Sequence, residues 1–278
     1  MMTRRLLGVF AHPDDESFGP AGTLAVHSAA GVDVHVATMT DGAAGAPAPG
    51  FPDGDGLAAI RREELRAAAK QLGATLHHFT YRDSGFTGDP RNDDPRAFIN
   101  VDPQEPTAAL VQLIREVRPD VIITHDEQGG YHHPDHIRCH EIVRTAFEAA
   151  GDAARFPDRG TPFQPSRLYS ETRSNRWIKA IAAGMRLIGR DPTRIGVNKD
   201  VDMTKVGMDP SRITTRIDVR HTWPIKRAAA ACHVSQRGGA GPFSRVPAWL
   251  MSRIAPYELY IREIPPPWPG LRERSLFN

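Results

Sequence analysis

The 278 residues have the composition of an ordinary globular protein, because 40% are hydrophobic and 24% are charged. This balance excludes disordered, fibrous and membrane-spanning chains. A formal net charge of +2 gives no reason to expect nucleic acid as a partner. No apolar run approaches the roughly 20 residues that cross a bilayer, so no membrane insertion is expected. Two cysteines form no disulfide framework, which favours a cytoplasmic location.

Strands and helices alternate through the first half of the chain. Strands are predicted at 4–11, 32–39, 76–81 and 121–124, and helices at about 21–30, 57–72 and 107–117. The pattern predicts an α/β fold, a Rossmann-like layered architecture with a mostly parallel central sheet flanked by helices. Two long polar loops, 41–56 and 83–105, follow predicted strands. Both should emerge at the carboxyl-end edge of the sheet, where open α/β folds bind ligands.

The pattern loosens beyond residue 158, where strands are predicted near 167–170 and 213–219 and helices near 175–188 and 224–233. The tail 264–270 is expected to be extended. We expect a single domain over 1–278, with a catalytic core at 1–158 and a smaller C-terminal subregion at 159–278 that walls the pocket. The segment 173–209 has no predicted role in the chemistry.

One predicted helix, 175–188, has an apolar stripe made of Trp177, Ile181, Met185 and Ile188. The favoured interpretation is an amphipathic helix whose stripe faces the core. A helix that lies on a membrane surface is the alternative.

Histidines and acids cluster after two of the predicted strands. The run His12-Pro13-Asp14-Asp15-Glu16 follows the first strand, and the run from Tyr131 to His136 follows the strand 121–124. Pro134 suits the first turn of a helix, with His133 at the cap and His136 within that turn. Carboxylates gathered at a sheet edge repel one another unless a cation offsets them. Both clusters should meet at one edge, which predicts a metal site.

Two imidazoles and one carboxylate with an open position form a catalytic zinc site, in which the pKa of bound water falls to about 7. One Zn²⁺ per chain is expected, with Fe²⁺ as the alternative ion. Asp14 is the candidate general base for amide hydrolysis. His133 or Tyr131 could donate to the tetrahedral oxyanion.

Other classes of protein also fit parts of this pattern. Two histidines and a carboxylate describe the site of non-haem Fe(II) oxygenases, although those enzymes usually carry it on an all-β fold. A sugar-binding protein with a vestigial site is a third interpretation. Homo-oligomerisation is left open by the sequence.

The motifs Ala11-His12-Pro13-Asp14-Asp15-Glu16 and His133-Pro134-Asp135-His136 resemble those of the LmbE-like (PIG-L) N-acetylglucosaminyl deacetylase family. The likeness extends over more than half the chain. It is closest to the mycothiol branch, which contains an inositol-linked N-acetylglucosamine deacetylase and a mycothiol S-conjugate amidase. The resemblance implies a zinc-dependent hydrolase that cleaves the N-acyl amide of a small amino-sugar substrate.

Carried over residue by residue, the family pattern makes His12, Asp15 and His136 the metal ligands and Asp14 the general base. It places His133 at the reacting centre and assigns Tyr131 to carbonyl polarisation or to movement over the site.

The resemblance also assigns Arg61 and Asp83 to substrate hydroxyls. The segment 226–236 resembles a family helix whose end, from His233 to Gln236, is expected to be structural or to support the site.

The two enzymes of the branch are not separated by the sequence. Residues 17–20 lack the amidase's lysine, and Ala43-Ala44 replaces the deacetylase's acidic pair. The run 137–140 and the segment 147–158 favour the amidase. Deacetylase and amidase therefore both remain open, as do the acyl group and the aglycone.

Overall fold

A seven-stranded sheet forms the centre of the molecule, in the order β3-β2-β1-β4-β5-β7-β6. The structure is a computed structural model that describes residues 3–195, 201–236 and 246–277. The strands are β1 Arg5–Phe10, β2 Asp33–Thr40, β3 Thr75–Tyr81, β4 Val121–His125, β5 Arg167–Thr172, β6 Thr215–Asp218 and β7 Tyr257–Ile264. Neighbouring strands from β3 to β5 are parallel, whereas β7 is antiparallel to both β5 and β6. The predicted α/β class with a mostly parallel sheet is confirmed.

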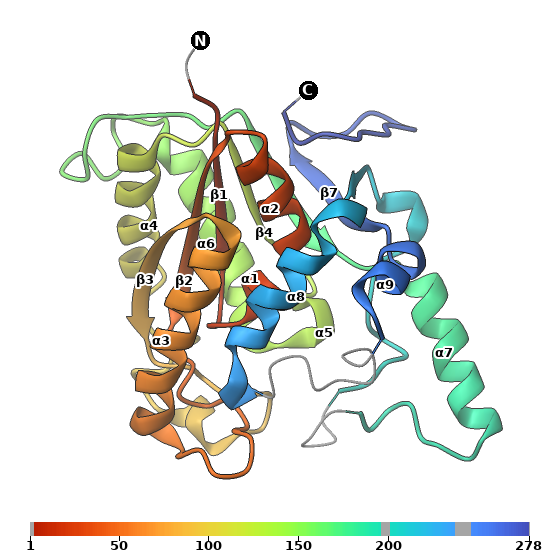
Figure 1. The fold of residues 1–278 in the computed structure, drawn as a ribbon. Helices are drawn as coiled ribbons and strands as arrows, with labels where there is room; N and C mark the ends of the chain where they lie inside the picture. The colour runs from red at the N-terminus through yellow and green to blue at the C-terminus, as the bar shows by residue number, and fades with distance from the viewer. Residues whose placement is uncertain (1–2, 196–200, 237–245, 278) are drawn as a thin grey trace.

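Helices cover both faces of this sheet (Figure 1). One face packs against α2 Ala21–Ala29, α3 Gly54–Leu72 and α8 Trp223–Cys232, and the other against α4 Gln104–Val117 and α6 Pro134–Ala150. Side chains alternate along β1 between these two cores, since Leu6 belongs to the first and Leu7 to the second. The remaining helices are α1 Asp15–Phe18, α5 Gly129–His132, α7 Asn175–Leu187 and α9 Ala248–Ile254, with short 3-10 turns η1 Pro90–Asp93, η2 Pro210–Arg212, η3 Arg220–Thr222 and η4 Val234–Gln236.

The helix ends follow the local signals in the sequence. Gly73 ends α3 with φ 64°, a left-handed conformation that glycine adopts without strain. Pro134 is the first residue of α6, and the His133 side chain caps the helix by accepting from the Asp135 N–H at 3.2 Å. The predicted start of this helix is therefore confirmed, and it fixes where its histidines point.

Strand β7 and helix α9 were missed by the sequence analysis, which expected only an extended tail from residue 264. Charged residues interrupt the apolar pattern of β7, and two of them, Glu258 and Arg262, are buried. Glu258 is ion-paired with Lys226 at 2.6 Å and Arg262 with Glu273 at 2.8 Å. These partners lie 32 and 11 residues away, outside β7 itself, so the pattern of the strand did not show that its charges could be buried.

Helix α7 is present, but the prediction that its stripe faces the core is wrong. Trp177 is 74% exposed and Ile188 is 70% exposed, whereas Ala182 is the buried residue of the helix. The half-buried Ile178 and Met185 lie on the same side as Ala182. The face against the body is thus rotated by about one residue from the predicted stripe. Within the described ranges, no helix is both long and apolar enough to cross a membrane.

Candidate active site

The two motifs meet because β1 and β4 are parallel neighbours whose carboxyl ends lie at one edge of the sheet. Residues 11–19, here named the β1 turn, follow β1. Residues 126–133, here named the β4 segment, follow β4 and lead into α6. The predicted edge of the sheet therefore carries both clusters.

All three predicted ligand residues converge, with donor atoms 3.1–3.5 Å from one another. His12 Nδ1 lies 3.1 Å from His136 Nε2 and 3.5 Å from Asp15 Oδ2, and His136 Nε2 lies 3.3 Å from Asp15 Oδ1. Ligand atoms of a tetrahedral zinc ion bound at about 2.0–2.1 Å are roughly 3.3–3.4 Å apart. The donor atoms and their spacing therefore fit a zinc-sized ion.

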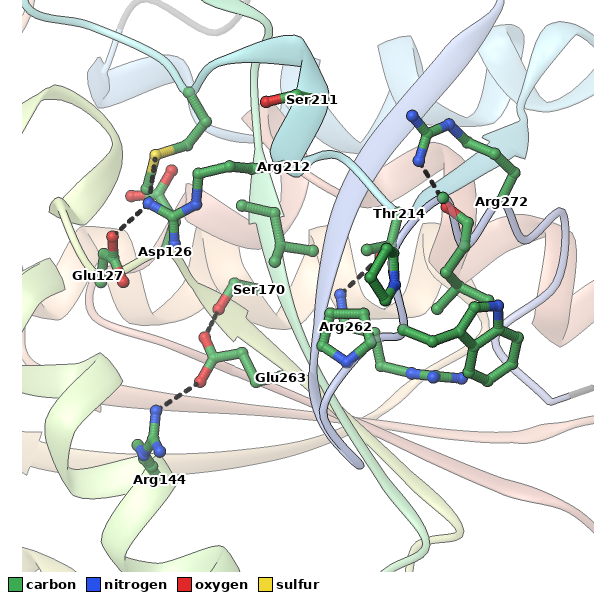
Figure 2. A pocket seen from close by; sticks show the side chains of 17 residues that line it. Asp126, Glu127, Arg144, Ser170, Ser211, Arg212, Thr214, Arg262, Glu263 and Arg272 are labelled. Atoms are coloured by element: carbon green, nitrogen blue, oxygen red, sulfur yellow. Dashed lines mark hydrogen bonds and ion pairs between the residues drawn. The ribbon is translucent and has the colours of Figure 1, made fainter.

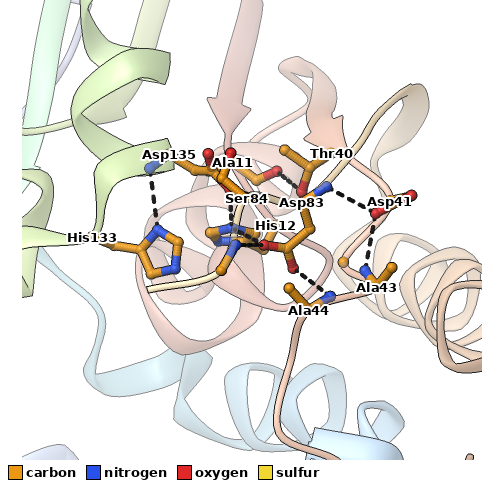
Figure 3. Close-up of polar contacts among 12 residues, drawn as sticks. Ala11, His12, Thr40, Asp41, Ala43, Ala44, Asp83, Ser84, His133 and Asp135 are labelled. Atoms are coloured by element: carbon orange, nitrogen blue, oxygen red, sulfur yellow. Dashed lines mark hydrogen bonds and ion pairs between the residues drawn. The ribbon is translucent and has the colours of Figure 1, made fainter. Parts of the chain in front are cut away.

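Two further carboxylates, those of Asp83 and Asp135, lie close to Nε2 of His12 (Figure 3). His12 Nε2 lies 3.1 Å from Asp135 Oδ2 and 3.5 Å from Asp83 Oδ1. Asp135 Oδ2 also accepts from the Ser84 N–H at 2.9 Å, which fixes the carboxylate. A carboxylate on the far nitrogen of a histidine orients the ring and makes it a stronger ligand.

The charges of this cluster favour a cation. Burial works against a charged His12, but Asp83, Asp135 and Asp15 together raise the pKa of this histidine well above its ordinary value. Burial lowers the pKa of His136 to about 4, which leaves the neutral ring that a metal ligand needs. Burial also opposes ionisation of Asp15, yet His136 and His125 hold the pKa of that carboxyl well below its usual range.

Asp14 lies beside these residues in an unusual backbone conformation. Its φ of 135° and ψ of −22° are rare for a residue with a side chain and cost on the order of 1–3 kcal/mol. Its carboxylate is ion-paired with Arg61 at 3.0 Å and is mostly buried. Burial, opposed by Arg61, raises the pKa of Asp14 to about 6, a value suited to a general base near neutral pH.

His133 and Tyr131 face the same centre from the β4 segment. The rings of His133 and His12 meet edge to face with centroids 4.5 Å apart. Since His133 Nδ1 accepts from a backbone N–H, its Nε2 is the nitrogen that carries hydrogen. The Tyr131 ring stands edge-on to His136 at 5.2 Å and is 37% exposed, so it lies over the site at the solvent side.

The two predicted substrate-binding residues also lie in the cluster, but their polar groups form hydrogen bonds to the protein's own backbone. Arg61 is 3% exposed and donates to the carbonyls of Gly42 and Pro13. Asp83 accepts from the N–H groups of Ala44 and Gly85 at 3.1 and 2.9 Å. Their assignment to substrate hydroxyls stays a prediction.

His125 was given no role by the sequence analysis, and the structure places it in the site. Its ring stacks on His136 with centroids 3.9 Å apart. His125 Nε2 accepts the Ala11 N–H at 3.0 Å, so that lone pair is occupied. This hydrogen bond joins the β1 turn to the end of β4 and explains the residue as structural support.

Asp135, Glu16 and Asp126 were likewise given no role, although Asp135 and Glu16 lie inside the recognised motifs.

A cavity of about 390 Å³ borders the β4 segment (Figure 2). Its polar residues largely pair with one another, since Arg212 bonds Glu127 at 2.6 Å and Glu263 is ion-paired with Arg144 at 3.6 Å. None of the predicted ligand or catalytic residues lines it. The cavity is therefore separate from the reaction centre.

Comparison with known proteins gives a consistent assignment. The family described as "PIG-L: GlcNAc-PI de-N-acetylase" matches residues 7–147. A 1D-myo-inositol 2-acetamido-2-deoxy-alpha-D-glucopyranoside deacetylase from Rhodococcus opacus (strain B4) is 41% identical over 247 residues, which is 85% of this chain and 82% of that protein.

Solved structures share the fold at lower identity. The N,N'-diacetylchitobiose deacetylase from Pyrococcus horikoshii has a TM-score of 0.63 at 20% identity, covering 96% of this chain and 84% of the other. GalB, the 4-carboxy-2-hydroxymuconate hydratase from Pseudomonas putida KT2440, has a TM-score of 0.60 at 18% identity, covering 96% and 98%. Because the fold carries different reactions, the structural likeness alone does not decide the chemistry.

The sequence matches do decide the family and the enzyme class. The family match includes both motifs, from His12 to Asp15 and from His133 to His136. The layered α/β fold does not favour the oxygenase alternative. The predicted class of enzyme, a hydrolase of amide bonds, is confirmed by the matches to deacetylases. The chain belongs to the PIG-L, or GlcNAc-PI de-N-acetylase, family.

Proposed function

We propose that this protein removes the acetyl group from an N-acetylglucosamine joined to inositol, with zinc held by His12, Asp15 and His136. The observation that carries the proposal is the convergence of these side chains. His12 Nδ1 lies 3.1 Å from His136 Nε2, and the two oxygens of Asp15 lie 3.5 Å from the first nitrogen and 3.3 Å from the second. Relatives at 36–41% identity that are named as deacetylases of this acetamido-glucosyl inositol support the substrate.

The bound metal would supply a Lewis acid and a water of lowered pKa at this point of the sheet. Asp14 is adjacent to the ligand Asp15 and has a raised pKa, so it can take the proton of the attacking water. The same carboxyl group then gives that proton to the amine nitrogen as the carbon–nitrogen bond breaks. Acetic acid and the free amine are the products: one proton of the water passes through Asp14 to the nitrogen and the other stays on the acetic acid, so Asp14 is again a carboxylate at the end.

The β4 segment would supply the donors to the developing oxyanion. His133 Nε2 carries hydrogen because Nδ1 is occupied by the cap of α6. The Tyr131 hydroxyl is the second candidate donor, and the partial exposure of this side chain beside His136 supports a contact with substrate. Arg61 and Asp83 remain the proposed contacts to the sugar or inositol hydroxyls. We propose both roles as further parts of this function.

The first test combines metal analysis with amine release from N-acetylglucosaminyl-inositol, with and without a chelator. We expect one zinc per chain and release that the chelator abolishes. Release from a mycothiol S-conjugate, with none from the acetylated compound, would instead assign the amidase reaction. Protein that binds no metal would contradict the proposal.

A pair of variants tests the assigned roles. Asp14→Ala should keep the metal and lower kcat by about 10²- to 10⁴-fold, because only the proton transfer is lost. His12→Ala should lose both metal and turnover. An Asp14→Ala enzyme with wild-type kcat would contradict the mechanism, whatever its metal content.

A further inference from the structure

The backbone of Asp14 is the most unusual feature of the β1 turn. Its φ is 135°, a value that residues with a side chain rarely adopt, and the residue here is an aspartate instead of the glycine that would adopt it without strain. Its carbonyl oxygen accepts from the N–H groups of Ser17 and Phe18, both at 2.9 Å, and so starts α1. Such a conformation persists only where neighbouring groups hold it.

The Glu16 carboxylate binds the backbone N–H of Asp14, on the other side of its Cα. Glu16 Oε2 accepts the Asp14 N–H at 3.0 Å, although the two residues are only two positions apart. Glu16 is fully buried, so its second oxygen also needs a donor. That oxygen, Oε1, receives the hydroxyl of Ser17 and lies 2.8 Å from His233 Nε2.

His233 comes from the far end of the chain, at the C-terminal end of α8. It is fully buried, and burial opposes its charging, yet its bond to Glu16 gives it a raised pKa. The next turn is fixed to α3, because the Ser235 N–H and hydroxyl donate to Glu64 at 2.7 and 2.6 Å. The C-terminal subregion thereby reaches Glu16 through this imidazole, while Lys226 separately donates to the Gly19 carbonyl oxygen at the end of the β1 turn.

The metal ligand beside Asp14 has separate support. Asp15 Oδ2 accepts the His12 N–H at 2.7 Å, and this bond does not involve Glu16 or His233. Arg61 holds the Asp14 carboxylate, not its backbone N–H. Loss of the Glu16 contact should therefore free the backbone of Asp14 while the ligand set stays in place.

We propose that Glu16 and His233 are positioning residues for the general base: Glu16 fixes the backbone N–H of Asp14, and His233 fixes Glu16. The inference rests on the proposed function, in which Asp14 moves the proton. It assigns a function to a C-terminal residue whose bond is to Glu16, next in the chain to the proposed ligand Asp15. The structural role expected for the end of α8 thus becomes a role in turnover.

Two substitutions of His233 differ only in the reach of the donor. His233→Gln places an amide near the Nε2 position, where it can still donate to Glu16, whereas the amide of His233→Asn is one methylene too short. We expect His233→Asn to lower kcat roughly 10- to 100-fold with KM within twofold, because small misplacements of a catalytic group have effects of this size. His233→Gln should stay within about threefold of wild type. Both should melt within a few degrees of each other and bind one metal per chain.

Equal losses of kcat in the two variants would overturn the proposal, as would a loss confined to KM or to metal content. The Asp14→Asn background provides a second check. There His233→Asn should cause no further loss of the residual rate, since the base it positions is absent. A repeated loss of the same factor would show a general structural effect and overturn the assignment.

Crystal structures of the wild type and of both variants separate this inference from the proposed function. We expect φ of Asp14 to remain positive in the wild type and in His233→Gln and to become negative in His233→Asn. A positive φ in all three would overturn the positioning role. A wild type that releases no amine would instead contradict the proposed function, and the φ values would still decide the role of His233.

Discussion

The β1 turn and the β4 segment carry the two halves of the proposed site, but they are held in different ways. The β1 turn is bonded to β2, α3 and the end of β4, through Thr40, Arg61 and His125. The β4 segment depends largely on one side chain: Asp126 accepts from the N–H groups of residues 128 and 130 and from the Thr172 hydroxyl.

The β1 turn is also more deeply buried than the β4 segment. His12 is 6% exposed at the centre of the β1 turn, whereas Tyr131 is 37% exposed in the β4 segment. The β4 segment has consecutive glycines with positive φ, and a cavity borders it (Figure 2). The residues proposed for metal and base are thus pre-organised, while the residue proposed to contact the carbonyl has room to move.

A matched pair of glycine substitutions should show the largest difference. A Cβ at Gly19 in the β1 turn would lie 2.9 Å from the Asp15 carbonyl oxygen, which cannot move away without shifting a proposed ligand. Gly19→Ala should therefore lower the free energy of unfolding by about 3 kcal/mol and weaken metal binding. Gly130→Ala meets open space and adds only the strain of a side chain at φ 68° and ψ −76°, about 1–2 kcal/mol, and it leaves the proposed ligands in place. Chemical denaturation and metal titration would measure both, and equal effects would contradict the comparison.

Tyr131→Phe tests the chemistry of the β4 segment without disturbing its packing. The Tyr131 side chain is 37% exposed, so loss of its hydroxyl should leave the melting temperature within about 1 °C of wild type. Loss of one donor to the oxyanion should lower kcat by roughly 30-fold, somewhat less than for a fully buried donor. An unchanged kcat would remove Tyr131 from the reaction.

Asp126→Ala should loosen the β4 segment alone. Without the carboxylate, the N–H groups of residues 128 and 130 lose their acceptor, and kcat/KM should fall about tenfold. Amide hydrogen exchange should become faster over 127–133 and stay unchanged over 11–19. Asp126→Asn, which keeps an acceptor oxygen, is the control. Faster exchange over 11–19 as well would show that the two segments are held together after all.

The smallest effect is expected from Glu171→Gln, through pH. Glu171 packs against Gly19, and burial raises the pKa of Glu171 from 4.5 to about 7 against the opposing charges of Arg173 and Lys226. The nearby acids Glu258 and Asp126 raise it further. A carboxyl with a raised folded-state pKa destabilises the fold as pH rises, with no penalty below about 4.5 and the full penalty above 7.

The substitution should therefore stabilise the protein at pH 8 by about 1 kcal/mol, after allowance for solvent screening, and have little effect at pH 4.5. Thermal melting at both values measures the difference. A gain of the same size at both would show that the effect comes from packing and not from charge.

The sequence alone predicted the layered α/β fold, most elements of the parallel sheet and the family. It also predicted that the turn at His12 and the cap at His133 would meet. These features depend on local periodicity, on Pro134 at a helix start and on short motifs, all of which are visible within a few residues. They meet because the carboxyl ends of parallel strands share one edge.

Only the tertiary structure decided which charges could be buried and which side chains hold the site. Glu258 in β7 finds Lys226, and Glu16 finds His233, at separations of 32 and 217 residues. The exposed face of α7 was likewise not predictable, because its amphipathic pattern does not say which side the body covers. A partner brought close by the fold leaves no local pattern in the chain, and burial of a charge depends on that partner.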